Sequence, residues 1–306
     1  MPPHDTREGL LYATSAYVLW GLSPLYWHLL MHVPSLEVTL HRIVWCALAV
    51  GIVVGMGGRL SSTLLRLRDL RLLATLALTG LLIAFNWGVM IWVVANEQLV
   101  EGTFGYYINP LINIGLGVLL LKERLSPLRW AAGALGLVAV LVQTVALGKF
   151  PFIAVALGGS FAFYGYFRKT ANIGGLDGVF VEALLLLPFA LLLLVWGTLN
   201  GEAVFLSGDV GMDFLLMLCG PVTALPLVLF AAGARQIRLS TIGFLQYIGP
   251  SIGLILAVFV FRERFTLVHA LTFGSVWCAL LLLAVEGGIR RVRPLGALPP
   301  LPPQKS

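Results

Sequence analysis

Long apolar segments recur along the chain from residue 9 to residue 286, separated by short polar connections. Each segment is close to the roughly 20 residues that an α-helix needs to cross a bilayer. The pattern therefore indicates an all-α polytopic membrane protein. It predicts ten transmembrane helices, at residues 9–31, 36–56, 72–95, 103–121, 129–147, 151–167, 178–198, 213–233, 240–261 and 267–286.

Composition supports this class. The chain is 59% hydrophobic and 11% charged, whereas about a quarter of the residues of a soluble domain are charged. The net charge of +6 fits basic residues gathered on one membrane side better than it fits nucleic-acid binding. The cysteines, Cys46, Cys219 and Cys278, all fall in apolar segments, and their spacing indicates no metal site. We expect no metal, no cofactor and no nucleic-acid partner.

The basic residues predict the orientation. An even number of spans places both termini on one side. If that side is the cytoplasm, most of the 20 Lys and Arg residues fall in inner connections, as the positive-inside rule requires. We therefore expect a multi-pass protein of the bacterial cytoplasmic (inner) membrane, as a monomer or a homodimer. The proline-rich tail, residues 294–306, is expected to be disordered and cytoplasmic.

An internal repeat divides the chain. The stretch "YINPLINIGLGVLLLKER" at 107–124 recurs as "YIGPSIGLILAVFVFRER" at 247–264. Each half, residues 9–147 and 151–286, then holds five spans, and an odd number inverts the second half in the membrane. Two inverted five-helix repeats are a common architecture of secondary transporters, whose substrate sites lie near the midplane at interrupted helices.

Two prolines stand at equivalent positions of the repeat. Pro110 and Pro250 each remove a backbone hydrogen bond and are predicted to break their helices. Such a break is tolerated in a membrane only where it faces protein or a water-filled cavity. A plain kink that aids helix packing is the alternative. Polar residues near the two breaks are candidates for solute binding or gating: Tyr106, Tyr107, Asn109, Asn113, Gln246 and Tyr247.

Two charges lie inside predicted spans, where they are costly unless paired. Arg42 is suited to a solute carboxylate or to an outer gate, and we expect Asn109 and Tyr106 to face it; snorkelling to the headgroups is the alternative. Glu182 is a candidate for proton coupling, with Gln246 or Tyr247 as nearby donors. A role as a capping or interfacial acid is also open.

Further candidates are weaker. Glu37 and His41 share a helix face and could relay protons, although a packing pair at the membrane edge fits equally. Aromatic residues such as Trp20 and Tyr164 could line a cavity for amphipathic or cationic groups, or they could be packing and interface anchors.

These segments resemble a known family, the EamA domains of the drug/metabolite transporter superfamily, and within it the RarD-type branch of chloramphenicol-sensitivity proteins. The resemblance implies a ten-helix fold, alternating access and movement of small metabolites without ATP. It favours an amphipathic solute such as an amino acid or a drug-like compound. The stretches that carry it are "AYVLWGLSPLYW" (16–27), "LHRIVW" (40–45), "GYYINPLINIGLGVLLLKERL" (105–125), "SFAFYGYFRK" (160–169) and "GFLQYIGPSIG" (243–253).

Two other classes compete with a secondary transporter. A non-transporting scaffold or sensor has no need of symmetric halves with paired helix breaks, so the repeat favours transport. A membrane enzyme would be expected to show metal-ligand or nucleophile motifs, and the chain has no HExxH, paired-aspartate, nucleophile-elbow or Walker A sequence. We therefore predict no catalytic residues, and we expect the lipid bilayer and a small-molecule solute as partners.

Overall fold

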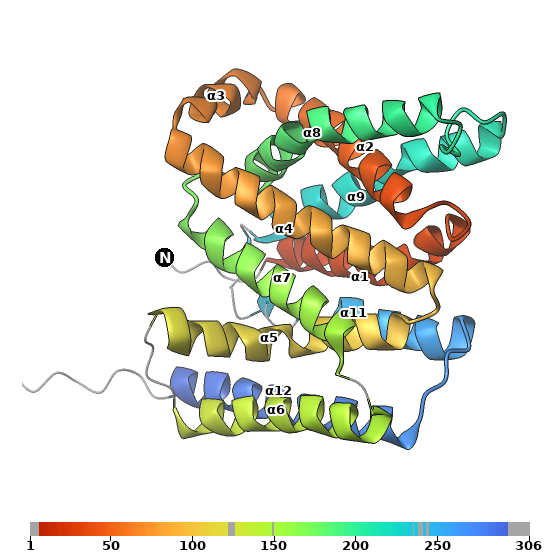
Figure 1. Ribbon diagram of the computed structural model, residues 1–306. Coiled ribbons are helices and arrows are strands. Elements are labelled where there is room, and N and C mark those ends of the chain that lie inside the picture. The colour runs from red at the N-terminus through yellow and green to blue at the C-terminus, as the bar shows by residue number, and fades with distance from the viewer. Residues whose placement is uncertain are drawn as a thin grey trace, which may run out of the picture. The chain divides into compact units, whose positions relative to one another are not determined.

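The computed structural model describes residues 6–121, 126–148, 150–234, 236–237, 241–242 and 245–292. These residues form helices and no strand (Figure 1), which confirms the all-α class. The first elements are α1 (Arg7–Leu29), α2 (Ser35–Met56), α3 (Leu60–Leu65), η1 (Arg66–Arg68), α4 (Leu70–Ala95) and α5 (Leu99–Leu121). The later ones are α6 (Pro127–Leu147), α7 (Phe152–Thr170), α8 (Gly175–Leu199), α9 (Val210–Ala234), α11 (Ile248–Ile255), η2 (Leu256–Val260) and α12 (Leu267–Val292).

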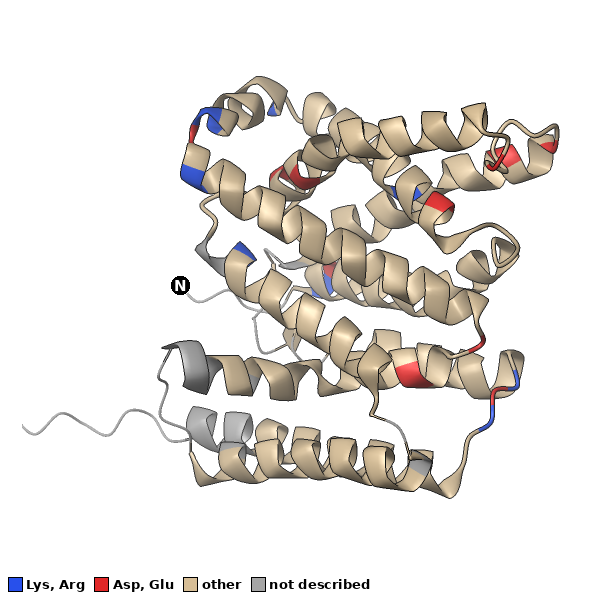
Figure 2. Ribbon diagram, in the orientation of Figure 1, with Lys and Arg blue, Asp and Glu red and all other residues tan. Residues whose placement is uncertain are grey.

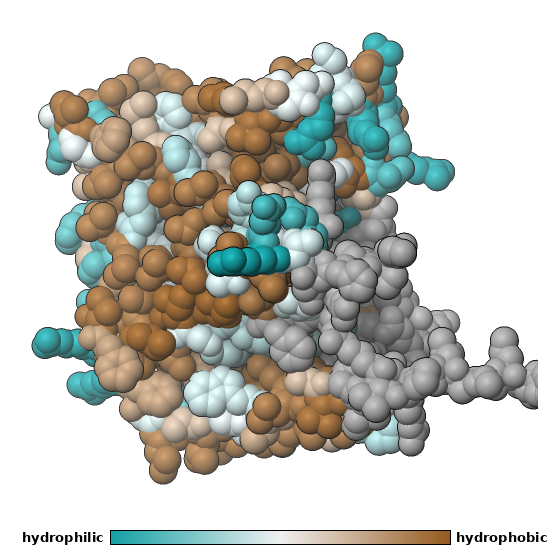
Figure 3. All heavy atoms as spheres, turned by 180° about the vertical axis from the view of Figure 1, so that it is seen from behind, coloured by the Kyte–Doolittle hydropathy of each residue, from teal (hydrophilic) through white to brown (hydrophobic). Residues whose placement is uncertain are grey.

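The helices suit a bilayer. Among the described residues, five of them, α2, α4, α8, α9 and α12, are long and apolar enough to cross a membrane, and shorter apolar helices lie at 130–146 and 248–260. Large apolar side chains are exposed along them; Phe189 and Trp196 on α8 are 67% and 64% exposed. Figure 3 shows hydrophobic residues over much of one face. A surface this apolar fits lipid rather than water. The total of ten spans remains a prediction.

The long helices contain few charged residues. In Figure 2 the coloured residues gather near helix ends and connections, with long uncharged stretches between them. Inside the described helices, Arg42 and Glu182 are buried, at 8% and 2% exposure. Charges buried at such depth require partners or a function, so these two residues are the natural starting points for a site.

The chain forms two compact units. One comprises residues 113–150 and 266–306, in which α6 packs against α12. The other comprises residues 1–112 and 151–265. In this larger unit α2 packs on α8 and α9, α4 packs on α7 and α8, and α1 packs on α9 and α11. One of its cores joins Cys46 and Val50 of α2 to Leu76 of α4 and Val181 of α8, and it fixes the helices that carry Arg42 and Glu182.

The two repeat prolines occupy different helical positions. Helix α5 continues through Pro110. Helix α11 begins at Ile248, so Pro250 lies in its first turn, where a missing N–H leaves no intrahelical hydrogen bond unmade. The span expected at 240–261 corresponds, among the described residues, to α11 and the π-helical turn η2. The proline-rich tail, 294–306, lies outside the described residues.

Helices α5 and α7 touch through their backbones. A Cβ atom on Gly158 would lie 2.7 Å from the carbonyl oxygen of Gly105, and one on Gly105 would lie 2.7 Å from that of Ala154. Asn109 of α5 donates from Nδ2 to the Gly158 carbonyl at 2.9 Å. Small residues permit this close approach, which is a common device between membrane helices.

The close approach predicts unequal effects for two adjacent glycines. Gly158→Ala should lower the thermal unfolding midpoint, because overpacking costs about 1–3 kcal/mol. Gly159→Ala is the matched control, since nothing lies within 4 Å of its added Cβ. It should leave the midpoint unchanged or raise it, because Ala is the better helix former by about 1 kcal/mol. Equal midpoints for the two variants in detergent would contradict the packing described here.

Candidate functional site

Glu182 lies where α4, α7 and α8 meet. Its Oε1 accepts a hydrogen bond from the Thr79 hydroxyl at 2.7 Å and lies 3.3 Å from Nε of Arg168. Its Oε2 accepts from the Tyr164 hydroxyl at 3.3 Å. The carboxylate therefore joins three helices through one cation and two hydroxyl donors. The expectation that Gln246 or Tyr247 would supply its donors is corrected, because depth along a helix axis does not reveal which helix faces the carboxylate.

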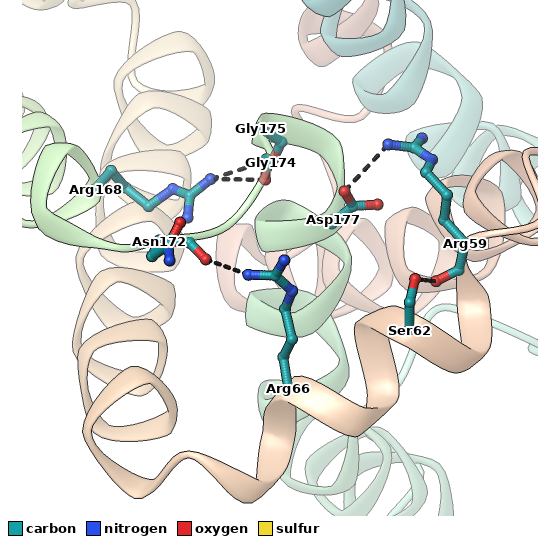
Figure 4. Close-up of polar contacts among 8 residues, drawn as sticks. All are labelled: Arg59, Ser62, Arg66, Arg168, Asn172, Gly174, Gly175 and Asp177. Carbon is teal, nitrogen blue, oxygen red and sulfur yellow. Dashed lines mark hydrogen bonds and ion pairs between the residues drawn. The ribbon is translucent and has the colours of Figure 1, made fainter.

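Arg168 extends this cluster to a chain connection. Its Nη2 donates to the carbonyl oxygens of Gly174 and Gly175, both at 3.3 Å (Figure 4). The guanidinium lies against Gly178, and a Cβ there would collide with it. Glycine at 178 therefore leaves the space through which Arg168 reaches Glu182, one turn further along α8.

Two further contacts join separate connections. Arg59 Nη1 lies 3.1 Å from Asp177 Oδ2, and Arg66 Nη1 donates to the Asn172 carbonyl at 2.5 Å (Figure 4). They link the α2–α4 connection to the α7–α8 connection. The first is a part-buried ion pair, and the second is a hydrogen bond from a cation to a backbone carbonyl. Together with the buried pair they form a set that we call the polar latch: Arg59, Arg66, Arg168, Asn172, Asp177 and Glu182.

Arg42 has a different environment. Its guanidinium carbon lies 4.7 Å from the ring centroid of Trp27 on α1 and 4.2 Å from that of Trp87 on α4. Both distances are within the range of cation–π attraction. At 8% exposure the side chain is buried, which excludes snorkelling. Among the described residues no hydrogen bond joins Arg42 to Asn109 or Tyr106, whose polar atoms bind other groups, although Tyr106 lies within electrostatic reach of the guanidinium.

Tyr106 and Asn109 belong to the interface with α7. The Tyr106 hydroxyl donates to Oδ1 of Asn86 at 2.9 Å, and Asn109 binds Gly158. Asn86 in turn donates from Nδ2 to the Leu157 carbonyl and to the Ser160 hydroxyl, each at 2.9 Å. Sequence reasoning passed over Asn86, although a polar residue inside an apolar span is a sufficient signal.

Glu37 and His41 do not pair with each other. Glu37 accepts the backbone N–H groups of Val204 and Phe205 at distances from 2.9 to 3.1 Å, and so holds the α8–α9 connection. His41 Nδ1 accepts from the Trp45 indole at 3.1 Å, and its ring lies 4.5 Å from that of Phe205. The shared helix face is present, but each side chain binds a different partner.

The remaining sequence candidates lie in two places. Tyr107 of α5 contacts the Ser251 hydroxyl at 2.6 Å and stacks on Tyr247, with centroids 6.2 Å apart; the backbone N–H of Gln246, next to Tyr247, bonds the Ile242 carbonyl at 3.0 Å. Trp20 packs against Phe230 of α9 at 5.6 Å. Asn113 is exposed.

One apolar groove of about 560 Å³ is present among the described residues. It lies between α2, α4 and α8, and it carries no charged residue. It is therefore separate from the expected cavity between the helices of Pro110 and Pro250. Its lining fits an acyl chain better than a polar solute. It is lined by Ser35, Leu36, Thr39, Leu40, Ile43, Leu81, Ala84, Phe85, Gly88, Val89, Trp92, Leu186, Phe189, Ala190 and Leu193.

Comparison with known proteins now identifies the family. The EamA-like transporter family matches residues 7–145. The chain is 39% identical to an uncharacterized transporter of Vibrio cholerae, over 92% of this chain and 94% of the relative. It is 41% identical to protein RarD of Streptomyces exfoliatus, over 92% and 89%, and 35% identical to protein RarD of Escherichia coli, over 94% and 97%.

The fold comparison agrees. A protein of known crystal structure, 19% identical, superposes with a TM-score of 0.60 over 94% of this chain and 99% of the other. The chain belongs to the EamA-like transporter family and is a multi-pass membrane transporter, as its sequence resemblance implied.

Glu263 anchors the start of α5. Its two carboxylate oxygens accept the N–H groups of Leu99 and Val100, at 2.6 and 2.8 Å. A carboxylate at a helix N-terminus is stabilised by the free N–H groups and by the helix dipole. Burial raises the pKa of Glu263 above the ordinary glutamate value, against the opposing effect of these two N–H groups.

This raised pKa predicts a pH dependence of stability. Between the unfolded and the folded pKa, the folded chain binds a proton that the unfolded chain has released, so stability falls as the pH rises through that window. Glu263→Gln should abolish this part of the slope in thermal unfolding measured from pH 4 to pH 8. Glu202→Gln, at an exposed acid, should keep the wild-type slope. A Glu263→Gln profile parallel to wild type would refute the assignment.

Proposed function

We propose that the protein is a secondary transporter that moves a small amphipathic metabolite, such as an amino acid or a drug-like solute, by alternating access. It would reside in the cytoplasmic (inner) membrane with both termini cytoplasmic. The observation that carries the proposal is the polar latch, which ties a connection of the first predicted repeat to a connection of the second. A scaffold needs no such contact around a buried acid.

The helix packing supports the two inverted repeats. If α1, α2 and α4 correspond to α7, α8 and α9, their most extensive contacts should recur with the halves exchanged. Helix α1 packs on α9, and the counterpart of this contact is that of α7 with α4. Helix α2 also packs on α9, and the counterpart of this contact is that of α8 with α4. Helix α1 also packs on α11, and its counterpart is the glycine contact of α7 with α5. Helices α2 and α8, which correspond to each other, pack together.

The latch supports an inner gate. Arg59, Arg66 and Arg168 are among the basic residues that the positive-inside rule assigns to the cytoplasmic side. Their contacts hold the two connections together, which supports a conformation closed at that side. Opening would require the exposed pairs to separate and the α7–α8 connection to move, as one bundle rocks against the other.

Glu182 is our candidate for coupling this gate to a proton. Protonation would neutralise its carboxylate and remove its attraction for Arg168, the residue that holds the Gly174 and Gly175 carbonyls. Glu37 and His41, the other coupling candidates, are bound to the α8–α9 connection and to Trp45. They therefore rank behind Glu182.

The test begins by finding a solute. Medium from cells that overproduce the protein is compared with medium from cells that lack it, and any solute that changes is supplied to proteoliposomes in a counterflow assay. We expect at least one such solute to exchange through the purified protein. Failure of every changed solute to exchange would contradict the transport function.

A cross-link tests the gate in the same assay. Cysteines replace Arg59 and Asp177, with Cys278→Ser to remove an exposed thiol. Joining them with a short bis-maleimide should stop exchange, because the latch can no longer open. The same variant without reagent, and each single cysteine with reagent, should continue to exchange. Unchanged exchange after complete cross-linking would show that the latch is no gate.

A further inference from the structure

Arg42 is a buried cation with no anionic partner. Among the described residues, no ion pair or hydrogen bond reaches its guanidinium, and its Nε is fully buried without a hydrogen-bond acceptor. An arginine inside a membrane costs on the order of 3 kcal/mol or more when it is unpaired. It also keeps its charge in any protein environment. Such a residue therefore requires an explanation beyond packing.

The two tryptophans attract the positive charge of the guanidinium but leave its hydrogen-bond donors unused. Trp27 and Trp87 attract its positive charge through the faces of their rings. The N–H donors of arginine lie in the guanidinium plane, so the ring contacts use none of them. A planar carboxylate is the group that matches this fork of donors, through two parallel hydrogen bonds.

The electrostatic surroundings of Arg42 favour an anionic ligand. Two thiols and two phenols, those of Cys46, Cys219, Tyr26 and Tyr106, are among the titratable groups near Arg42. Thiols and phenols are ordinarily neutral at pH 7. The two buried acids of the described helices are engaged elsewhere, Glu37 with backbone N–H groups and Glu182 with Arg168. The position therefore carries one uncompensated positive charge.

The surroundings are also aromatic. Trp27 and Trp87 flank the charge, and Trp20 lies two helical turns before Trp27, which places it on the same face of α1 about 10 Å away. Trp20 continues into a cluster with Tyr17 and Phe230. An apolar body attached to a carboxylate could pack along this row of rings, since aromatic side chains supply a large apolar contact area.

We propose that Arg42 binds the carboxylate of the transported solute, and that the site takes a monocarboxylate with an apolar body. The proposal rests on the transport function argued above and deepens it. Because the described residues offer no free acid near Arg42, an amino group on the solute gains no ionic partner there. The site therefore prefers a simple carboxylate to the corresponding amine, and it does not require a zwitterion.

Binding to the protein in nanodiscs tests the proposal without any transport. The probes are acetate, butyrate and 3-phenylpropionate, with 3-phenylpropionamide and phenethylamine as the neutral and cationic matches of the largest acid. Calorimetry should show affinity rising along the three acids, and at least tenfold weaker binding of the amide and the amine. Absence of binding by all three acids, or equal binding of acid and amide, would overturn the proposal.

Variants assign the binding to Arg42. Arg42→Met should weaken 3-phenylpropionate binding at least tenfold, and Arg42→Lys should recover part of it, because it restores a charge without the planar fork. Arg71→Met is the control at an exposed position and should bind as wild type does. Each variant is first checked by thermal unfolding. If Arg42→Met unfolds, Arg42→Gln takes its place beside Arg42→Lys, and equal affinity of Arg42→Gln with wild type refutes the site.

Flux separates this proposal from the transport function. Binding of 3-phenylpropionate that depends on Arg42, without exchange of any solute in proteoliposomes, supports the carboxylate site and contradicts transport. If the protein exchanges solutes but its binding depends neither on the carboxylate of the ligand nor on Arg42, transport is supported and the carboxylate site is overturned.

Discussion

The ion pair of Arg168 with Glu182 is the interaction on which the arrangement of this site depends. A carboxylate 2% exposed cannot remain charged within an apolar bundle unless cations and donors surround it. Thr79, Tyr164 and Arg168 meet this requirement from α4 and α7. The same arginine then binds the carbonyls of the α7–α8 connection, so a charge in the bundle determines the position of a loop.

Arg42 and Glu182 show two outcomes of the same constraint. Glu182 finds its cation within the protein, and its cluster closes one side. Among the described residues Arg42 contacts the ring faces of Trp27 and Trp87, and we propose that its in-plane donors bind a ligand. A buried charge without a partner lowers the stability of the protein when no ligand is bound. It also makes binding selective, because only a ligand of opposite charge offsets the free-energy cost of burying that charge.

Sequence reasoning found the class, the family and the two buried charges, because apolar runs and charges within them depend only on local composition. It did not find the hydrogen-bond partners of Glu182 or the two tryptophans beside Arg42. Depth along an axis places Glu182 near Tyr247, yet the partners come from Thr79 and Arg168, because partner choice depends on which helix faces pack together. Nothing in the sequence marks Arg168 or Thr79 as a partner of Glu182. Pro110 and Pro250 align in sequence, but helix α11 begins only two residues before Pro250, at Ile248, whereas α5 continues through Pro110.

We propose that the charge on Glu182 holds the polar latch closed. Spin labels at Ser62 and Asn172, exposed residues on its two sides, would report the separation by double electron–electron resonance in a Cys278→Ser background. The account predicts that Glu182→Gln adds a population at longer distance, whereas Glu202→Gln leaves the wild-type distribution unchanged. A Glu182→Gln distribution identical to that of wild type would contradict it.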